Sequence, residues 1–155
     1  MRATTRRRAA AALDEALRRA RAVGNRFVAG TSLTAMVALR GRHGPPEPAL
    51  ALFRDAIDHW RANRNRALLV TTLRNLVLLL ARTGRDEAAA TLAAALEGAA
   101  PSRSYGVEAA RIATALAAVR RRLGDAAYDG AWAAGEVRTL EEAADDTMRL
   151  LAPAD

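Results

Sequence analysis

The sequence contains no lysine and no cysteine, so two of the common reactive side chains are missing from its 155 residues. All 24 basic residues are therefore arginines. A phosphate-binding loop with its Walker lysine, a Schiff-base lysine and a lysine general base cannot be built from this chain. Disulfides, thiolate nucleophiles and cysteine-ligated zinc are excluded in the same way.

Aromatic residues and long apolar runs are also scarce. Aromatic residues make up 4% of the chain, although 51% of it is hydrophobic. The core must come from leucine, valine and alanine, a composition that favours closely packed helices over sheets. The longest apolar run, 76–81, is far shorter than the roughly 18 residues that span a bilayer, and Asp14 and Glu15 interrupt any signal peptide. We therefore expect a cytoplasmic protein without a membrane partner.

The net charge of +7 is distributed unevenly along the chain. Residues 1–26 carry eight arginines and two acids, whereas residues 125–155 carry two arginines and eight acids. A basic chain suggests nucleic acid as a partner, but the base-stacking aromatics and a helix-turn-helix signature are missing. A nucleic-acid-associated basic helical protein is therefore the alternative interpretation, and direct binding of DNA or RNA is not our main expectation.

What the sequence does contain is a repeat of about forty residues. Gly44, Gly84 and Gly124 are spaced by forty, and each follows an apolar segment with helical periodicity. Glycine accepts the left-handed conformation that ends many helices, so each is expected to close a helical hairpin. Asn25 and Asn65, also forty apart, are predicted to cap the helices that follow them.

This repeat predicts an all-α fold, an α-solenoid of seven or eight antiparallel helices in one domain over residues 1–155. The C-terminal helix is expected to begin at a capping box formed by Thr139 and Glu142. The predicted segments are a helix at 4–23 without a partner in its own repeat, repeats at 26–62, 65–98 and 105–135, and the C-terminal helix at 139–152.

In the second helix of each repeat, a small or medium residue is followed four positions later by a large residue and seven positions later by a small one, which places all three on one helical face. We expect the small residues to let the first helix of the repeat approach closely and the large residues to be buried. The three sets are Ala49, Phe53 and Ala56; Ala88, Leu92 and Ala95; and Tyr128, Trp132 and Gly135.

These features resemble the tetratricopeptide (TPR) family, whose first helix carries Asn-Leu and then a turn glycine, as do Asn75, Leu76 and Gly84. The repeat here is longer than that family's, and the third copy is degenerate. Three stretches also resemble the C-terminal helical-repeat region of large actinobacterial signal-transduction ATPases of the LuxR-type, antibiotic-regulator and nucleotide-cyclase-linked kinds. They read ALALFRDAIDHWR, TTLRNLVLLLARTGRDEAAATLAAALE and YGVEAARIATALAAVRRRLGDAAYDGAW. The resemblance implies a protein-binding or sensor module of a transcriptional or signalling regulator, as its C-terminal part or a detached remnant.

In tetratricopeptide-like stacks the first helices line a concave groove, and the resemblance places ten threonines and arginines in it. It implies a basic groove for a protein or an acidic peptide, because guanidinium groups match carboxylates bidentately. A merely solvated polar face is the other interpretation. The ten residues are Thr31, Thr34, Arg42, Thr71, Arg74, Arg82, Arg111, Thr114, Arg121 and Arg122.

The sequence offers little for catalysis. Neither His43 nor His59 has a second ligand at metal-binding spacing, and acid pairs such as Asp86 and Glu87 lie in first helical turns, where they offset the helix dipole. We expect no catalytic residue, no metal, no cofactor and no enzyme activity. A small-molecule-binding helical domain ranks third among the interpretations, after protein binding and nucleic-acid association.

The N-terminal helix should leave Leu13 and Leu17 open on one side, because no first helix of its own repeat covers it. We expect this edge to contact upstream domains of a parent regulator or, weakly, a second copy of the chain.

Overall fold

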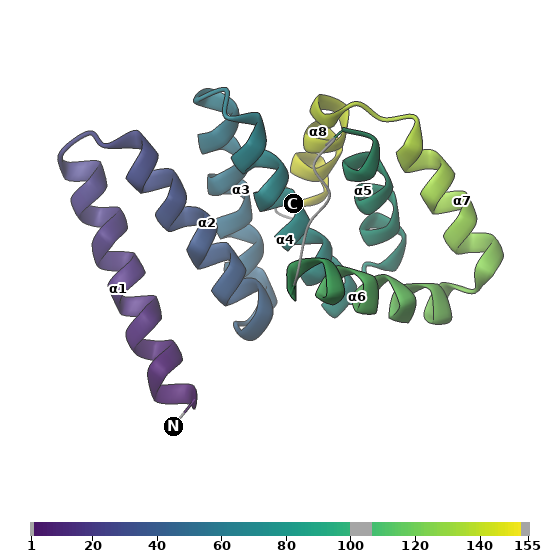
Figure 1. The fold of residues 1–155 in the computed structure, drawn as a ribbon, viewed down its shortest axis with the longest axis horizontal. Helices are drawn as coiled ribbons and strands as arrows, with labels where there is room; N and C mark the ends of the chain where they lie inside the picture. The colour runs from purple at the N-terminus through teal and green to yellow at the C-terminus, as the bar shows by residue number, and fades with distance from the viewer. Residues whose placement is uncertain (1, 100–106, 153–155) are drawn as a thin grey trace. The chain divides into compact units, whose positions relative to one another are not determined.

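The computed structural model describes residues 2–99 and 107–152, and almost all of them lie in eight α-helices with no strand among them. The all-α prediction is confirmed. The predicted start of the third repeat, residue 105, lies outside the described residues. Within this part of the chain, no helix is both long enough and apolar enough to cross a membrane. In chain order (Figure 1), the helices are α1 (Arg2–Ala22), α2 (Arg26–His43), α3 (Pro46–Ala62), α4 (Arg66–Arg82), α5 (Asp86–Ala99), α6 (Val107–Leu123), α7 (Asp125–Glu136) and α8 (Leu140–Leu150).

The chain forms two compact units that meet between Thr72 and Leu73. Helix α4 contributes its first half to unit 1 and its second half to unit 2. The assignment of residues 1–155 to a single domain stays a prediction.

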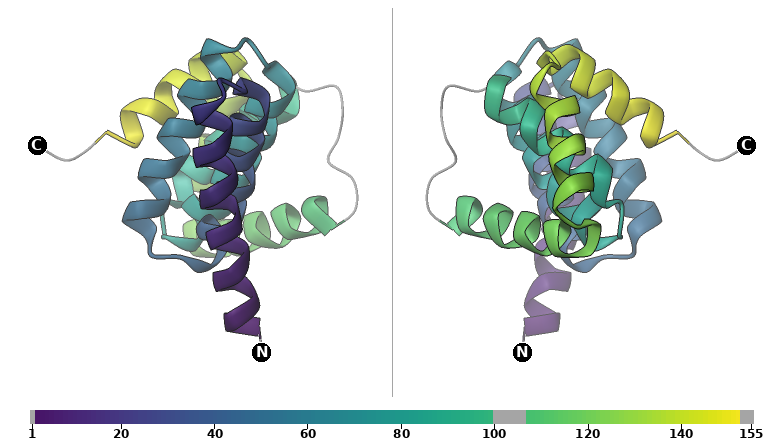
Figure 2. Two further views of the ribbon diagram at one scale, coloured as in Figure 1. Left: turned by 90° about the vertical axis from the view of Figure 1, so that its left-hand side faces the viewer. Right: turned by 90° about the vertical axis from the view of Figure 1, so that its right-hand side faces the viewer.

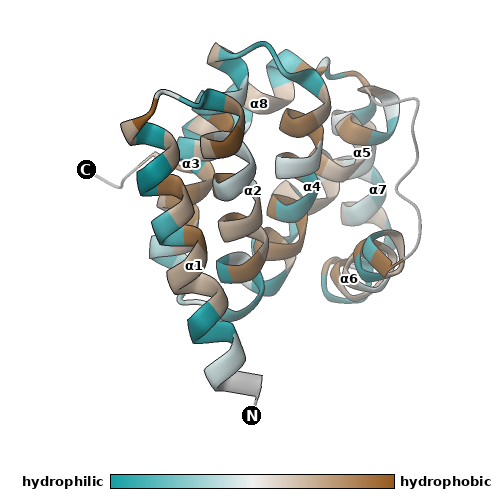
Figure 3. Ribbon diagram, turned by 60° about the vertical axis from the view of Figure 1, so that its left-hand side comes forward, coloured by the Kyte–Doolittle hydropathy of each residue, from teal (hydrophilic) through white to brown (hydrophobic). Residues whose placement is uncertain are grey.

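In unit 1, consecutive helices pack as antiparallel pairs, α1 with α2 and α2 with α3 (Figure 1). Polar and apolar residues alternate along α1 and α2 (Figure 3), as expected of helices buried on one side. Leu17 is only 7% exposed, so the expectation that the N-terminal edge leaves it open is wrong: α2 covers it, while Leu13 is half-buried. Arg40 adds a link between the two helices by donating to both carboxylate oxygens of Asp14 at 2.9 Å.

In unit 2, α5 is the central helix, and α6, α7 and α8 all pack against it. The most extensive packing is between α5 and α7, where a Cβ atom added at Gly135 would overlap the carbonyl oxygen of Thr91. Gly135 therefore allows α7 to pack closely against α5, the second helix of the preceding repeat. Our prediction that it admits the first helix of its own repeat is wrong at this position.

The third repeat departs from the first two, as its degenerate sequence indicates. Helix α6 lies nearly perpendicular to α7 in the right-hand view of Figure 2, and Val119 is its only fully buried residue within Val107–Leu123. Leu116 is half-buried, whereas Met36 and Leu76, its equivalents in the earlier repeats, are 3% and 0% exposed. The buried position predicted for Trp132 is also wrong: it is half-buried and stacks on Tyr128, with ring centroids 5.7 Å apart.

Two of the three repeat glycines have the predicted positive φ, +75° at Gly84 and +80° at Gly124, although a ψ of 159° places Gly124 in the extended positive-φ region rather than the left-handed helical one. Gly44 does not, because its φ is −91° and its ψ is 173°. The reason is Pro45, since the ring of a proline forces the residue before it into extended backbone. The sequence did not predict a second pair of residues with positive φ. These are Gly24, with a φ of +69°, and Arg64, with a φ of +51°, which lie forty residues apart in the turns that join one repeat to the next.

The predicted helix caps are confirmed. The Asn25 side chain accepts a hydrogen bond from the backbone N–H of Val28 at 3.0 Å, and Asn65 accepts from Leu68 at 3.1 Å. At the start of α8, Thr139 and Glu142 form both hydrogen bonds of a capping box.

Candidate functional site

Three of the four threonines predicted for the groove form side-chain hydrogen bonds within their own helices. Each hydroxyl donates to a backbone carbonyl one turn earlier, an arrangement common for threonine within helices. These hydroxyls retain only acceptor capacity for a ligand. The pairs are Thr31 with Val28 at 3.1 Å, Thr71 with Ala67 at 3.1 Å, and Thr114 with Ala110 at 2.8 Å.

Thr34 belongs to a hydrogen-bond chain inside unit 1. Its hydroxyl accepts from the indole N–H of Trp60 at 2.8 Å and lies 3.3 Å from the hydroxyl of Thr72. Thr72 donates its own hydrogen to the carbonyl of Leu68 at 2.8 Å, so Thr34 must be the donor in the contact with Thr72. The chain connects α3, α2 and α4, and Thr34 therefore has a structural role.

Arg122 is likewise engaged inside unit 2. Its guanidinium donates to both carboxylate oxygens of Asp86, at 2.7 and 2.5 Å, and to the carbonyl of Ala81 at 2.9 Å. Asp86 is 9% exposed, and the hydrogen bond from Arg122 lowers the pKa of its carboxyl despite the opposing effect of burial. From the sequence, Asp86 was predicted only to offset the dipole of α5. In the structure, its ion pair with Arg122 also connects α5 to the end of α6.

This pair predicts a specific pH dependence of stability. Because the folded pKa of Asp86 lies below its ordinary value of 3.8, its contribution is fully present above pH 4 and is lost as the pH falls through the folded pKa. Asp86→Asn should therefore lower the thermal midpoint at pH 7, and the difference from wild type should shrink below pH 4. Melts between pH 2.5 and 7 test this, with the exposed neighbour variant Glu87→Gln as control. A difference in thermal midpoint between wild type and Asp86→Asn that stays constant down to pH 2.5 would contradict the stabilising role of the Asp86–Arg122 pair.

Besides Arg122, four of the predicted groove arginines lie on α4 and α6 within unit 2. Arg74 is half-buried, and Arg82, Arg111 and Arg121 are exposed. Arg42 lies in unit 1, and its Nε donates to the carbonyl of Ala38 at 2.6 Å. The ten residues are thus divided between two units, four in the first and six in the second, and a continuous groove stays a prediction.

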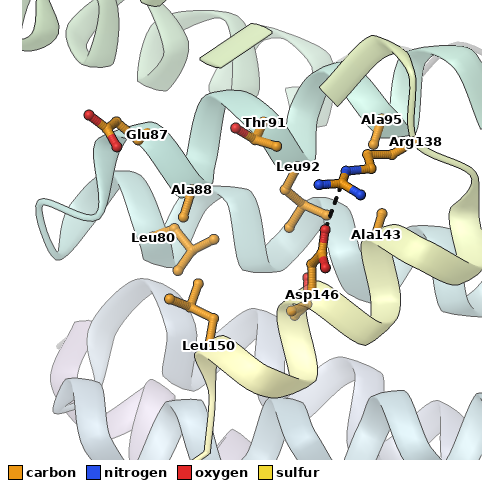
Figure 4. Close-up of a pocket in the computed structure, with 11 residues that line it drawn as sticks. Leu80, Glu87, Ala88, Thr91, Leu92, Ala95, Arg138, Ala143, Asp146 and Leu150 are labelled. Atoms are coloured by element: carbon orange, nitrogen blue, oxygen red, sulfur yellow. Dashed lines mark ion pairs between the residues drawn. The ribbon is translucent and has the colours of Figure 1, made fainter. Parts of the chain in front are cut away.

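Unit 2 also contains a cleft of about 300 Å³ that the sequence did not reveal (Figure 4). It lies along α5 and is bounded by α8, the end of α4 and the turn before α8. The pattern of Ala88, Leu92 and Ala95 identified the face of α5 that forms one wall, but not the helix opposite it. The lining is mainly apolar, from Leu80, Ala88, Leu92, Ala95, Ala143 and Leu150, with Glu87, Thr91, Arg138, Asp146 and Thr147 as its polar members.

Charged groups lie toward opposite ends of this cleft (Figure 4). At one end, Arg138 Nε is 3.4 Å from a carboxylate oxygen of Asp146, which also pairs with Arg149 on the same helix. At the other end stands Glu87, one helical turn before Thr91. The Thr91 hydroxyl donates to the carbonyl of Ala131 at 3.0 Å, so toward the cleft it can only accept.

His59 contributes to packing, consistent with the absence of any ligand spacing around it. One of its ring nitrogens, Nε2, is 2.8 Å from the carbonyl oxygen of Arg26, and the ring packs edge-on against Trp60 with centroids 4.9 Å apart. Residues 2–99 and 107–152 contain no group of three or more His, Asp or Glu side chains placed to hold a metal ion.

The chain was compared with protein-family models, with curated proteins and with solved structures. None of these comparisons finds a match. The protein is therefore described by its fold, an all-helical arrangement of consecutive pairs. The family resemblance rests on the sequence stretches quoted above.

Proposed function

We propose that this chain is a non-catalytic module that binds a protein segment, as the helical-repeat region of an ATPase-type transcriptional or signalling regulator. The observation that carries the proposal is the set of four arginines, Arg74, Arg82, Arg111 and Arg121, on α4 and α6, the first helices of two successive repeats. Successive first helices form the ligand-binding surface in the families that the sequence resembles.

Charge favours an acidic segment as the ligand. Helix α4 contains no acidic residue, and α6 contains only Glu108 within Val107–Leu123. Guanidinium groups bind carboxylates with two parallel hydrogen bonds, so a run of aspartate and glutamate or a C-terminal carboxylate fits this surface. Phosphate groups attract the same side chains, and the experiment must therefore separate peptide from nucleic acid.

Charge reversal at one exposed arginine of each helix tests the proposal. The double variant Arg82→Glu, Arg121→Glu should bind a fluorescent Asp- and Glu-rich peptide at least about tenfold more weakly than wild type, since two attractive contacts become repulsive. Fluorescence anisotropy measures the affinity, and circular dichroism should report unchanged helicity.

The matched control is Arg6→Glu, Arg7→Glu, which makes the same change of charge at the start of α1. It should leave peptide binding within about twofold of wild type if binding depends on the arginines of α4 and α6 rather than on the net charge of the protein. If both double variants weakened peptide binding equally, the effect would be due to net charge alone, and the proposed site on α4 and α6 would be refuted. Random duplex DNA competing more strongly than the peptide would favour nucleic-acid association instead.

A further inference from the structure

The cleft along α5 presents more hydrogen-bond acceptors than donors. Glu87 forms no ion pair within the described part of the chain, and Thr91 has already given its hydrogen to Ala131. These two acceptors are four residues apart, so they lie on the same side of α5. Arg138 is the only cationic side chain in the lining, and Asp146 accounts for its charge.

The rest of the lining is apolar and offers a hydrophobic surface next to the two acceptors. Leu80, Leu92 and Leu150 come from three different helices and meet in the cleft (Figure 4). A volume of about 300 Å³ is at the small end of ligand pockets. A ligand that fills it should combine a small hydrophobic body with a group that donates hydrogen bonds and carries positive charge.

We propose that this cleft binds a small apolar amine, whose ammonium group is held by Glu87 and Thr91 and whose hydrocarbon part lies against the three leucines. An ammonium group supplies three donors and a positive charge, which complement a carboxylate and a hydroxyl that can only accept. A carboxylate ligand would instead face the negative charge of Glu87, whereas the charge of Asp146 is compensated by Arg138 and Arg149.

The amine is not a lysine side chain of this protein. The chain has no lysine, so a second copy cannot place a lysine side chain in the cleft. The proposal shares no residue with the arginine surface of α4 and α6, and either can fail without the other.

Three probes of similar size and different charge provide the test: 2-phenylethylammonium, 2-phenylethanol and 3-phenylpropionate. Titration calorimetry on the full chain at low salt should show the amine binding about tenfold more tightly than the alcohol, since a charge-assisted hydrogen bond adds roughly that factor. The carboxylate should bind most weakly. Equal affinity for amine and alcohol, or preference for the carboxylate, would overturn the proposal, as would failure of the amine to bind at 10 mM, about the weakest affinity such a titration resolves.

Variants locate the binding. Glu87→Gln should reduce the preference for amine over alcohol to about twofold or less, because the charge is removed while the side-chain size is kept. Glu97→Gln makes the same change at an exposed position of α5 outside the cleft and should keep the full preference. Ala88→Leu, which extends a half-buried side chain of the lining, should weaken both ligands. If amine binding survives Glu87→Gln and Ala88→Leu unchanged, the site lies elsewhere and the proposal is wrong.

Discussion

Replacing Trp60 with alanine is expected to lower the free energy of unfolding by about 3–5 kcal/mol, the usual range for removing a fully buried aromatic side chain. Trp60 is 1% exposed and fills the space that Gly30 leaves open: a Cβ atom on Gly30 would lie 2.5 Å from Cζ2 of the indole. The residue also heads the hydrogen-bond chain through Thr34, so truncation removes packing and leaves a half-buried hydroxyl without its donor.

Trp60→Phe separates the two contributions. It keeps an aromatic ring in the same space and removes the N–H, so the loss should fall to about 1–3 kcal/mol. Urea denaturation followed by circular dichroism gives both values, since the variants lack one of the two tryptophans on which fluorescence would depend. Equal losses for the two variants would show that ring volume contributes little and that our account of the core of unit 1 is wrong.

The features that were predictable from sequence are those determined by residues close together in the chain. Apolar periodicity placed the eight helices, and the caps at Asn25 and Asn65 depend on backbone groups three residues away. The turn at Gly84 is equally local. The extended backbone of Gly44 is also determined locally, because Pro45 follows it directly. The constraint that a proline places on the residue before it overrides the preference of glycine for a left-handed turn.

The features that were missed depend on how helices pack across longer separations. Arg122 was assigned to a groove because of its place on a first helix, whereas it reaches Asp86, 36 residues earlier. Thr34 was assigned in the same way, and Trp60 is the donor to its hydroxyl. A repeat register identifies equivalent positions, but it does not specify which neighbouring helix satisfies a polar side chain or encloses a cleft.

Two glycines of α7 allow a matched test of helix propensity, which is local, against packing between helices. Gly130 and Gly135 have the same chemistry, five residues apart in one helix. A Cβ atom at Gly130 would meet nothing within 4 Å, whereas at Gly135 it would overlap the Thr91 carbonyl oxygen and lie 2.7 Å from Cβ of Ala94. The nearest obstacle at Gly135 is backbone of α5, which cannot move aside as the end of a flexible side chain can.

Gly130→Ala is expected to stabilise the protein by about 0.5–1 kcal/mol, because alanine loses less conformational entropy than glycine within a helix. Gly135→Ala gains the same helical preference and forces α7 away from α5, so a net loss of about 1–3 kcal/mol is expected, as for other overpacked sites. Denaturation of the two variants beside wild type measures both changes. Opposite signs would establish that contact between second helices of adjacent repeats holds unit 2 together, and stabilisation by both substitutions would exclude the close approach of α5 and α7.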